Sequence, residues 1–189
     1  MSFTPNPVLE FLLTRRSRPA KVLRGPAPDR AELEVLLQAA ARVPDHGKLE
    51  PWRFIVLQQP AGSRVAAQIM EYAAANGLDG EKPARAFLDS PLCVAVIASP
   101  KPSEKIPEIE QTLSAGAVCL ALVNAALASG WGASWLSGWP AHDARLMQSI
   151  LGIAPQEWVA GFVHIGTSDF APPDRPRPDL AAITEWVSA

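Results

Sequence analysis

The sequence predicts an α+β fold in which helices cover both faces of a sheet of four short strands. Four short apolar segments, bounded by Pro, Gly or Ser, indicate the strands. The segments between them repeat apolar residues at helical spacing. No internal repeat or low-complexity linker divides the chain, so a single domain over residues 1–189 is expected. The predicted strands read WRFIVLQ (52–58), SPLCVAVIAS (90–99), WGASWLSG (131–138) and EWVAGFVHIG (157–166).

Local signals place the first two helices. Asn6 followed by Pro7 is typical of a helix start, and apolar residues at helical spacing carry this helix to residues 15–17. Asp29 and Glu32, three residues apart, form a candidate capping box ahead of an apolar stripe. The second helix therefore delivers the chain to the loop before the first strand.

The remaining helices are predicted with less local detail. Residues 60–88 suggest two short helices, and an Ala-rich stretch predicts a long helix over residues 109–129 that ends at Gly130. The tail after residue 167 is Pro-rich and then weakly helical, so it is expected to run extended over the surface before docking.

Composition excludes several classes of protein. The chain is 48% apolar and 19% charged with a formal net charge of -2, so neither disorder nor nucleic-acid binding is expected. Cys93 and Cys119 lie in apolar runs without metal-ligand or redox spacing, which is typical of buried, reduced thiols in a cytoplasmic protein. The basic residues of the N-terminal segment follow its apolar part, the reverse of a secretory signal.

Residues 111–141 contain no Asp, Glu, Lys or Arg and raise the question of a membrane span. The segment is rich in Ala, Gly and Ser, contains Asn124 and is interrupted by Gly130 and Gly132, so a helix buried on all sides is the better interpretation. One small subunit is unlikely to cover so much apolar surface. A homodimer through this helix is therefore expected.

The common catalytic and nucleotide motifs are missing. No G-x-G-x-x-G, Walker or G-x-S-x-G sequence is present, which disfavours a Rossmann dinucleotide site, a P-loop and a serine hydrolase. His46, His142 and His164 show no metal-ligand spacing, and His164 is expected to be a hydrogen-bonded core histidine.

Two polar segments allow both a structural and a functional interpretation. TRRSR (14–18) is either a solvated helix end or a phosphate clamp, since guanidinium groups present a planar fork of donors to phosphate oxygens. RVPDHGKLEPWRF (42–54) is either a solvated corner or part of a site.

Four segments in register resemble the nitroreductase family of FMN-dependent oxidoreductases, in its short single-domain branch with a Pro-Asp-His motif. The likeness covers almost the whole chain. The segments are RRS (15–17), PDHGKLEPWRFIVL (44–57), SAGAVCLALVNAALASGWGASWLSG (114–138) and VAGFVHIGT (159–167).

The resemblance implies a nitroreductase-like fold, a central mixed β-sheet flanked by helices on both faces, and a homodimer with one FMN at each end of the interface. The FMN would be held by residues of both chains. The positions that match cofactor contacts are Arg15, Arg16 and Ser17 for the phosphate and ribityl chain, Arg42 and His46 from the loop, Trp135, Leu136 and Ser137 beside the cofactor, and Arg177 or Arg175 from the tail. Lys48 and Glu50 depart from the usual Asn and Gln.

The implied activity is oxidation of NADH or NADPH with reduction of a small electron-poor aromatic acceptor, a nitroaromatic or a quinone, by ping-pong hydride transfer. Flavin performs this chemistry, so no catalytic acid or base is expected. Arg42, His46 or Lys48 could place a cation beside the ring. An alternative is an FMN-binding carrier or redox sensor without efficient turnover.

Overall fold

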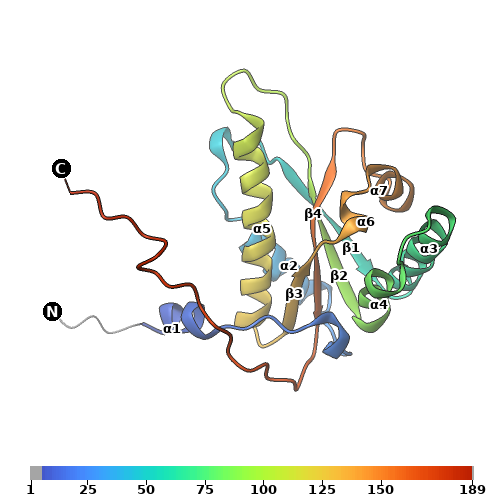
Figure 1. Ribbon diagram of the computed structural model, residues 1–189, viewed down its shortest axis with the longest axis horizontal. Coiled ribbons are helices and arrows are strands. Elements are labelled where there is room, and N and C mark those ends of the chain that lie inside the picture. Colours follow the sequence, from blue (N-terminus) through green and yellow to red (C-terminus); the bar gives the residue numbers. More distant parts are fainter. Residues whose placement is uncertain (1–5, 189) are drawn as a thin grey trace.

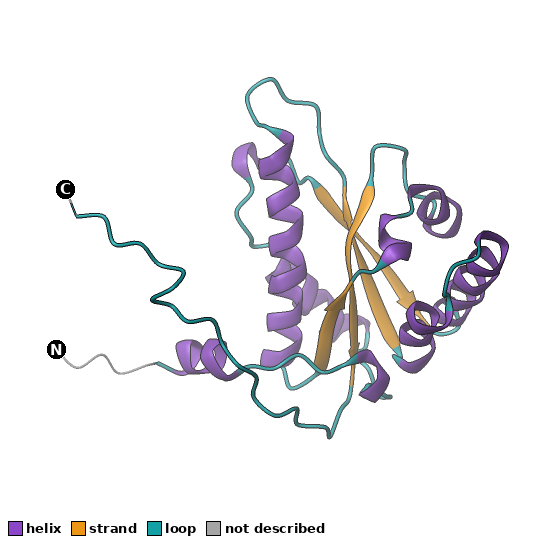
Figure 2. Cartoon of the chain, viewed as in Figure 1, coloured by secondary structure: helices purple, strands orange, loops and turns teal. Residues whose placement is uncertain are grey.

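A computed structural model describes residues 6–188 and contains the four predicted strands in one sheet (Figures 1 and 2). The sheet order is β1-β2-β4-β3. β4 therefore lies between two strands that precede it in the sequence, and β3 forms an edge. The strands are β1 (Trp52–Gln58), β2 (Leu92–Ala98), β3 (Gly132–Leu136) and β4 (Trp158–Gly166).

All neighbouring strands in the sheet pair antiparallel, so the expectation of a mixed sheet was wrong. Phe54 pairs with Val96, Cys93 with His164, and Trp135 with Val163. Every residue of β2 is buried, a pattern that parallel strands usually show. Here helices cover both faces of an antiparallel sheet, which gives the same continuous apolar run.

One face of the sheet is covered by α2 (Arg30–Ala40) and α5 (Glu108–Ala128), as Figure 1 shows. The capping box of α2 is confirmed, because the Asp29 carboxylate accepts the Glu32 amide and the Glu32 carboxylate accepts the Asp29 amide. Leu36, Val94 and Leu122 belong to the apolar core between these helices and the sheet.

The opposite face is covered by a second apolar core that includes Phe87, Met147 and Phe162. α3 is longer than the short helix predicted, and α6 and α7 were not predicted at all. Asp143 begins α7 by accepting the Leu146 amide at 2.9 Å. The helices on this face are α3 (Ala61–Asn76), α4 (Glu81–Asp89), α6 (Trp139–His142) and α7 (Ala144–Leu151).

The two ends of the chain lie outside these layers. α1 (Pro7–Thr14) begins as predicted, with the Asn6 side chain accepting the Leu9 amide. Two short 3₁₀ turns, Ala20–Val22 and His46–Lys48, complete the helical elements. The expected helix in the tail was wrong, because residues 180–182 form only a turn and the tail runs extended away from the sheet (Figure 1).

α5 is not buried on all sides within this chain, contrary to expectation. Leu113 and Leu120 lie on its outer side and are 66% and 47% exposed, and Ile109 is exposed on the same side. Among the described residues α5 is the one helix whose length and hydropathy would suit a membrane span. However, its inner side packs on the sheet and on α2, as in the core helix of a soluble protein.

Two predictions about buried polar groups are confirmed. His164 is 1% exposed, and its Nδ1 lies 2.7 Å from Ser90 Oγ. Burial lowers the pKa of His164 to about 4, so this histidine is neutral at physiological pH. Cys93 and Cys119 are free, buried thiols.

A bidentate ion pair ties β1 to the start of β4. Arg53 Nε and Nη2 donate to the two carboxylate oxygens of Glu157 at 2.8 and 2.7 Å, and the Ala154 amide donates to Glu157 Oε2. The Arg53 guanidinium, followed by the Ala154 amide, lowers the pKa of Glu157 to about 2 although burial opposes this shift. The Glu157 side chain is 6% exposed and the Arg53 side chain 42%, so the carboxylate is shielded from solvent and the guanidinium only in part.

Trp135 on the edge strand β3 is positioned by a glycine. Its Nε1 donates to the Ala160 carbonyl at 3.3 Å, and its indole covers Gly161 on β4. A Cβ at residue 161 would lie 1.9 Å from Trp135 Nε1, so any larger side chain would displace the indole.

We predict an acid-sensitive contribution of Glu157 to stability. Its folded pKa lies below its unfolded value, so the contribution is present above pH 5 and lost as the pH falls toward 2. Wild type should lose about 2 kcal/mol more unfolding free energy than Glu157→Gln between pH 6 and pH 3. Urea unfolding of both proteins at the two pH values measures this difference, and equal losses would contradict it.

We also predict that residues 135 and 161 are energetically coupled. Gly161→Ala should lower the unfolding free energy by about 1–3 kcal/mol because of overpacking against the indole. The same substitution in a Trp135→Leu background should cost much less. A double-mutant cycle from urea unfolding measures the coupling, and additive effects would refute the contact.

Candidate functional site

An arginine cluster lies where α1 ends. The helix stops at residue 14, and the following extended segment passes beside the C-terminal end of α5. A cavity of about 290 Å³ lies at this point. Its lining residues are Phe11, Thr14, Arg15, Arg16, Arg18, Leu127 and Pro172.

The Arg15 guanidinium carries an unused donor. Its Nη1 is buried and has no hydrogen-bond partner among the described residues. Leaving a buried cationic donor unpaired is costly, so this position favours an anion that the chain itself does not provide. A terminal phosphate fits it, because guanidinium groups bind phosphate oxygens in a bidentate manner. Arg15 and Arg16, two of the residues predicted to contact phosphate, thus line one cavity together with Arg18.

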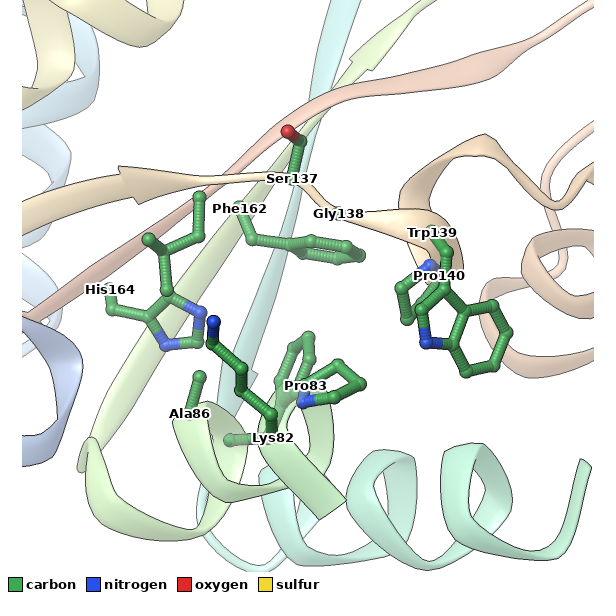
Figure 3. Close-up of a pocket in the computed structure, with 11 residues that line it drawn as sticks. Lys82, Pro83, Ala86, Ser137, Gly138, Trp139, Pro140, Phe162 and His164 are labelled. Atoms are coloured by element: carbon green, nitrogen blue, oxygen red, sulfur yellow. The ribbon is translucent and has the colours of Figure 1, made fainter. Parts of the chain in front are cut away.

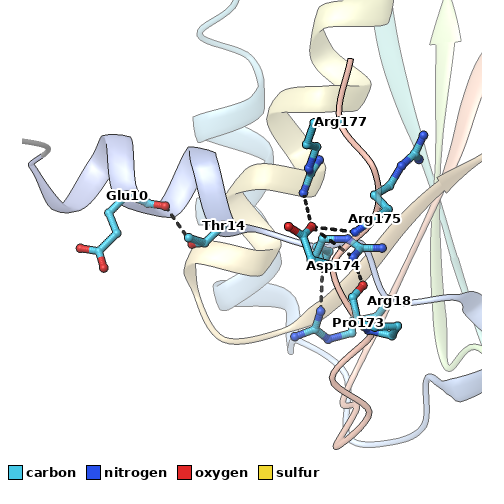
Figure 4. Close-up of polar contacts among 8 residues, drawn as sticks. Glu10, Thr14, Arg18, Pro173, Asp174, Arg175 and Arg177 are labelled. Carbon is cyan, nitrogen blue, oxygen red and sulfur yellow. Dashed lines mark hydrogen bonds and ion pairs between the residues drawn. The ribbon is translucent and has the colours of Figure 1, made fainter. Parts of the chain in front are cut away.

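The C-terminal tail crosses the arginine cluster, as Figure 4 shows. Asp174 Oδ1 lies 3.5 Å from Arg16 Nη1 and accepts a hydrogen bond from Arg177 Nη2 at 2.8 Å. The Arg175 amide and then the Arg177 guanidinium hold the pKa of Asp174 below its ordinary value. Asp174 therefore brings Arg177, one of the predicted residues, to the edge of this cluster.

The edge strand β3 connects the arginine cluster to the predicted ring-contact segment. The Arg18 amide donates to the Ala133 carbonyl at 2.8 Å, which ties the two segments together. Trp135 then points to the α5 side of the sheet, where its ring lies near Gly116, and Leu136 points to the α4 side. Trp135, Leu136 and the following Ser137 are all exposed.

The other predicted residues lie on the loop between α2 and β1. His46 Nδ1 lies 2.7 Å from Glu110 Oε2 in the first turn of α5. Ser114 Oγ donates to the Pro44 carbonyl at 2.7 Å and accepts a hydrogen bond from Trp52 Nε1. The loop is therefore fixed to the N-terminal end of α5 and does not form a free solvated corner.

The backbone of this loop is constrained. Gly47, Lys48 and Glu50 all adopt positive φ, with values of 73°, 56° and 48°. The Asp45 carboxylate stabilises the turn by accepting the Leu49 and Glu50 amides at 3.1 and 2.8 Å. Strained backbone of this kind is concentrated at functional sites, and it leaves the Lys48 side chain exposed.

One chain does not bring the two groups of predicted residues together. His46 binds Glu110 near the start of α5, and the arginine cavity contacts Leu127 near its end. Seventeen residues at a rise of 1.5 Å place these points about 25 Å apart. Arg15, Arg16, Ser17 and Arg177 thus lie at one end of α5, and His46 and Lys48 lie toward the other, with Arg42 at the start of their loop.

The sequence missed a cavity on the α4 side of β3. It is about 300 Å³ in volume, and Leu136 and Ser137 form part of its wall together with Lys82 from α4 (Figure 3). Lys82 is an exposed lysine with no distinctive motif around it, so no sequence signal could have identified it. Arg18 did have a signal, since it belongs to the TRRSR segment.

The sequence is similar to that of a known protein family. The nitroreductase family model matches residues 12–167. An Escherichia coli (strain K12) protein named as an NAD(P)H nitroreductase, YdjA, is 35% identical over 162 residues, which cover 84% of this chain and 87% of YdjA.

Solved structures show the same fold at lower identity. A nitroreductase-like family protein from Bacillus cereus is 21% identical, with a TM-score of 0.82 and full coverage of both chains. A nitroreductase from Desulfovibrio desulfuricans in complex with FMN is also 21% identical, with a TM-score of 0.75 and 96% coverage of each chain. The family match over residues 12–167 and the 35% identity to the Escherichia coli protein establish that the chain belongs to the nitroreductase family.

Proposed function

We propose that this chain is an FMN-dependent NAD(P)H oxidoreductase that reduces nitroaromatic or quinone-like acceptors by a ping-pong mechanism. The observation that carries the proposal is the buried, unpaired Arg15 donor in a cavity lined by three arginines. A single phosphate ester satisfies this cluster. No adenosine-binding motif accompanies it, which favours FMN over FAD.

The proposed site is shared between two copies of the chain. The exposed apolar residues of α5, among them Leu113 and Leu120, supply a surface that a second copy can cover. A two-fold arrangement with the two α5 helices antiparallel brings the arginine cluster of one subunit to the His46 loop of the other. This homodimer removes the separation of about 25 Å that divides the two groups within one chain.

The residues then have distinct roles. Arg15, Arg16 and Arg18 bind the phosphate, and the backbone at Leu136 and Ser137 lies against the ring. Arg42 and His46 approach the same cofactor from the other subunit, with Lys48 exposed beside them. Bound FMN supplies the hydride chemistry and serves the nicotinamide donor and the acceptor in turn. A cation near the ring favours the reduced cofactor by stabilising its negative charge.

An anaerobic titration tests this function. The purified protein, loaded with FMN, should lose its flavin absorbance on addition of NADH or NADPH and recover it on addition of a nitroaromatic or quinone. Steady-state kinetics should give the parallel double-reciprocal lines of a ping-pong mechanism. A protein that binds FMN but is not reduced by either nucleotide would instead be a carrier or sensor, and one that takes up no FMN would refute the proposal.

We predict that Arg15→Ala weakens FMN binding by about ten- to a hundredfold, because a charge-assisted hydrogen bond to phosphate contributes about 1.5–3 kcal/mol. Riboflavin, which has no phosphate, should bind wild type and variant with similar affinity. Fluorescence titration measures both ligands. Arg30→Ala is the matched control, since Arg30 is exposed and paired with Glu34; an equal effect of both variants on FMN would contradict the assignment.

A further inference from the structure

The cavity between α4 and the β3–α6 turn combines an aromatic floor with one formal charge. Phe87 contacts Phe162 edge to face at a centroid distance of 5.0 Å and His164 at 5.1 Å. Trp139 and Pro83 complete the apolar walls. The volume of about 300 Å³ is at the lower end of the range of about 300–1,000 Å³ for ligand pockets. A ligand of one or two aromatic rings suits this size.

Lys82 is the one charged side chain among the residues that line this cavity. His164 faces Ser90 and Cys93 with its two nitrogens, and its pKa of about 4 keeps it neutral. Figure 3 shows the Lys82 side chain extending from α4 across the cavity toward the β3 side, whereas the Ser137 hydroxyl points away. Among the described residues, Lys82 makes no ion pair or hydrogen bond.

Lys82 also lines a second cavity, on the outer side of α4, and the nearby acidic residues Asp79, Glu81 and Asp89 lie there. In this cavity Asp89 pairs with Arg85 at 3.0 Å. None of these carboxylates lines the aromatic cavity. Among the described residues Lys82 pairs with none of these carboxylates, so its ammonium is available to an anion whose apolar body packs against the aromatic walls of the cavity.

We infer that this cavity binds aromatic carboxylates, with the rings against Phe87 and Phe162 and the carboxylate on Lys82. Leu136 and Ser137 belong both to this cavity and to the segment assigned to the cofactor ring. A nitro- or quinone-bearing aromatic acid bound here lies beside that segment. Lys82 thus selects anionic over neutral acceptors. This assignment of a substrate class rests on the proposed function.

The test compares 2-naphthoate with 2-naphthamide, which differ in charge but share the same rings. Calorimetry on the FMN-loaded protein without a nicotinamide nucleotide gives both affinities. Wild type should bind the carboxylate about fivefold more tightly than the amide. This difference is larger than that expected from an exposed ion pair and smaller than that from a buried charge-assisted hydrogen bond. Lys82→Met should abolish this preference and Lys82→Arg should retain it. Arg85→Met, at a residue that lines the second cavity and not the aromatic one, should also retain it.

A kinetic comparison connects binding to turnover. The ratio of kcat/KM for 4-nitrobenzoate over 4-nitrobenzamide should fall by a similar factor in Lys82→Met and stay unchanged in Arg85→Met. Equal naphthoate affinity of wild type and Lys82→Met, or no naphthoate binding, would overturn the inference. A lost binding preference with an unchanged kinetic ratio would overturn its assignment to the acceptor. Naphthoate binding to a protein that reduces no acceptor would refute the proposed function and leave the binding site standing.

Discussion

The long helix α5 has one side in the core and one side at the surface, and it separates the two groups of candidate residues. Its inner side packs against the sheet through residues such as Val118 and Leu122, whereas its outer side exposes Leu113 and Leu120. Its two ends hold the arginine cluster and the His46 loop apart. A helix that forms part of the core and part of the surface thus sets the distance between the two groups of candidate residues and leaves an apolar surface exposed.

Two features of the candidate site reduce the stability of the chain: an unpaired buried donor and a strained loop. The buried Arg15 donor is unsatisfied within the described chain, and the loop at Gly47–Glu50 holds three consecutive or near-consecutive residues at positive φ. Stabilising contacts lie nearby: the Asp45 carboxylate closes the loop, and Ser114 ties it to α5. Strain and orphaned donors of this kind are expected where a ligand provides the missing partner.

Local patterns in the sequence predicted local structure well. Trp52–Gln58 was predicted with its observed bounds because its apolar run is closed by turn residues, and the Asp29–Glu32 capping box is a contact between near neighbours. Strand direction was misjudged, since the buried run of β2 does not reveal how its partners run. The tail contains helix-forming residues, but no packing surface holds them in a helix.

The candidate site was predicted only in part, because some of its residues are brought together by the fold and not by the sequence. The arginines at 15–18 are adjacent in the sequence, so their convergence needed no knowledge of the fold. The distance between this cluster and His46 depends on how α5 lies in space, and Lys82 acquires its cavity from segments at 136–140 and 162–164. Such long-range relations are invisible to periodicity and spacing. The family resemblance indicated the cofactor but not this aromatic cavity.

We propose that each cofactor site combines the arginine cluster of one subunit with the His46 loop of the other. Purified heterodimers of an Arg15→Ala chain and an Arg42→Ala/His46→Ala chain test it by FMN titration. We expect about one tightly bound FMN per heterodimer, because the two-fold symmetry places all the substitutions in one site and leaves the other site intact. Homodimers of either variant should bind FMN weakly. Heterodimers without a tight site, or a monomer that holds FMN tightly, would contradict the claim.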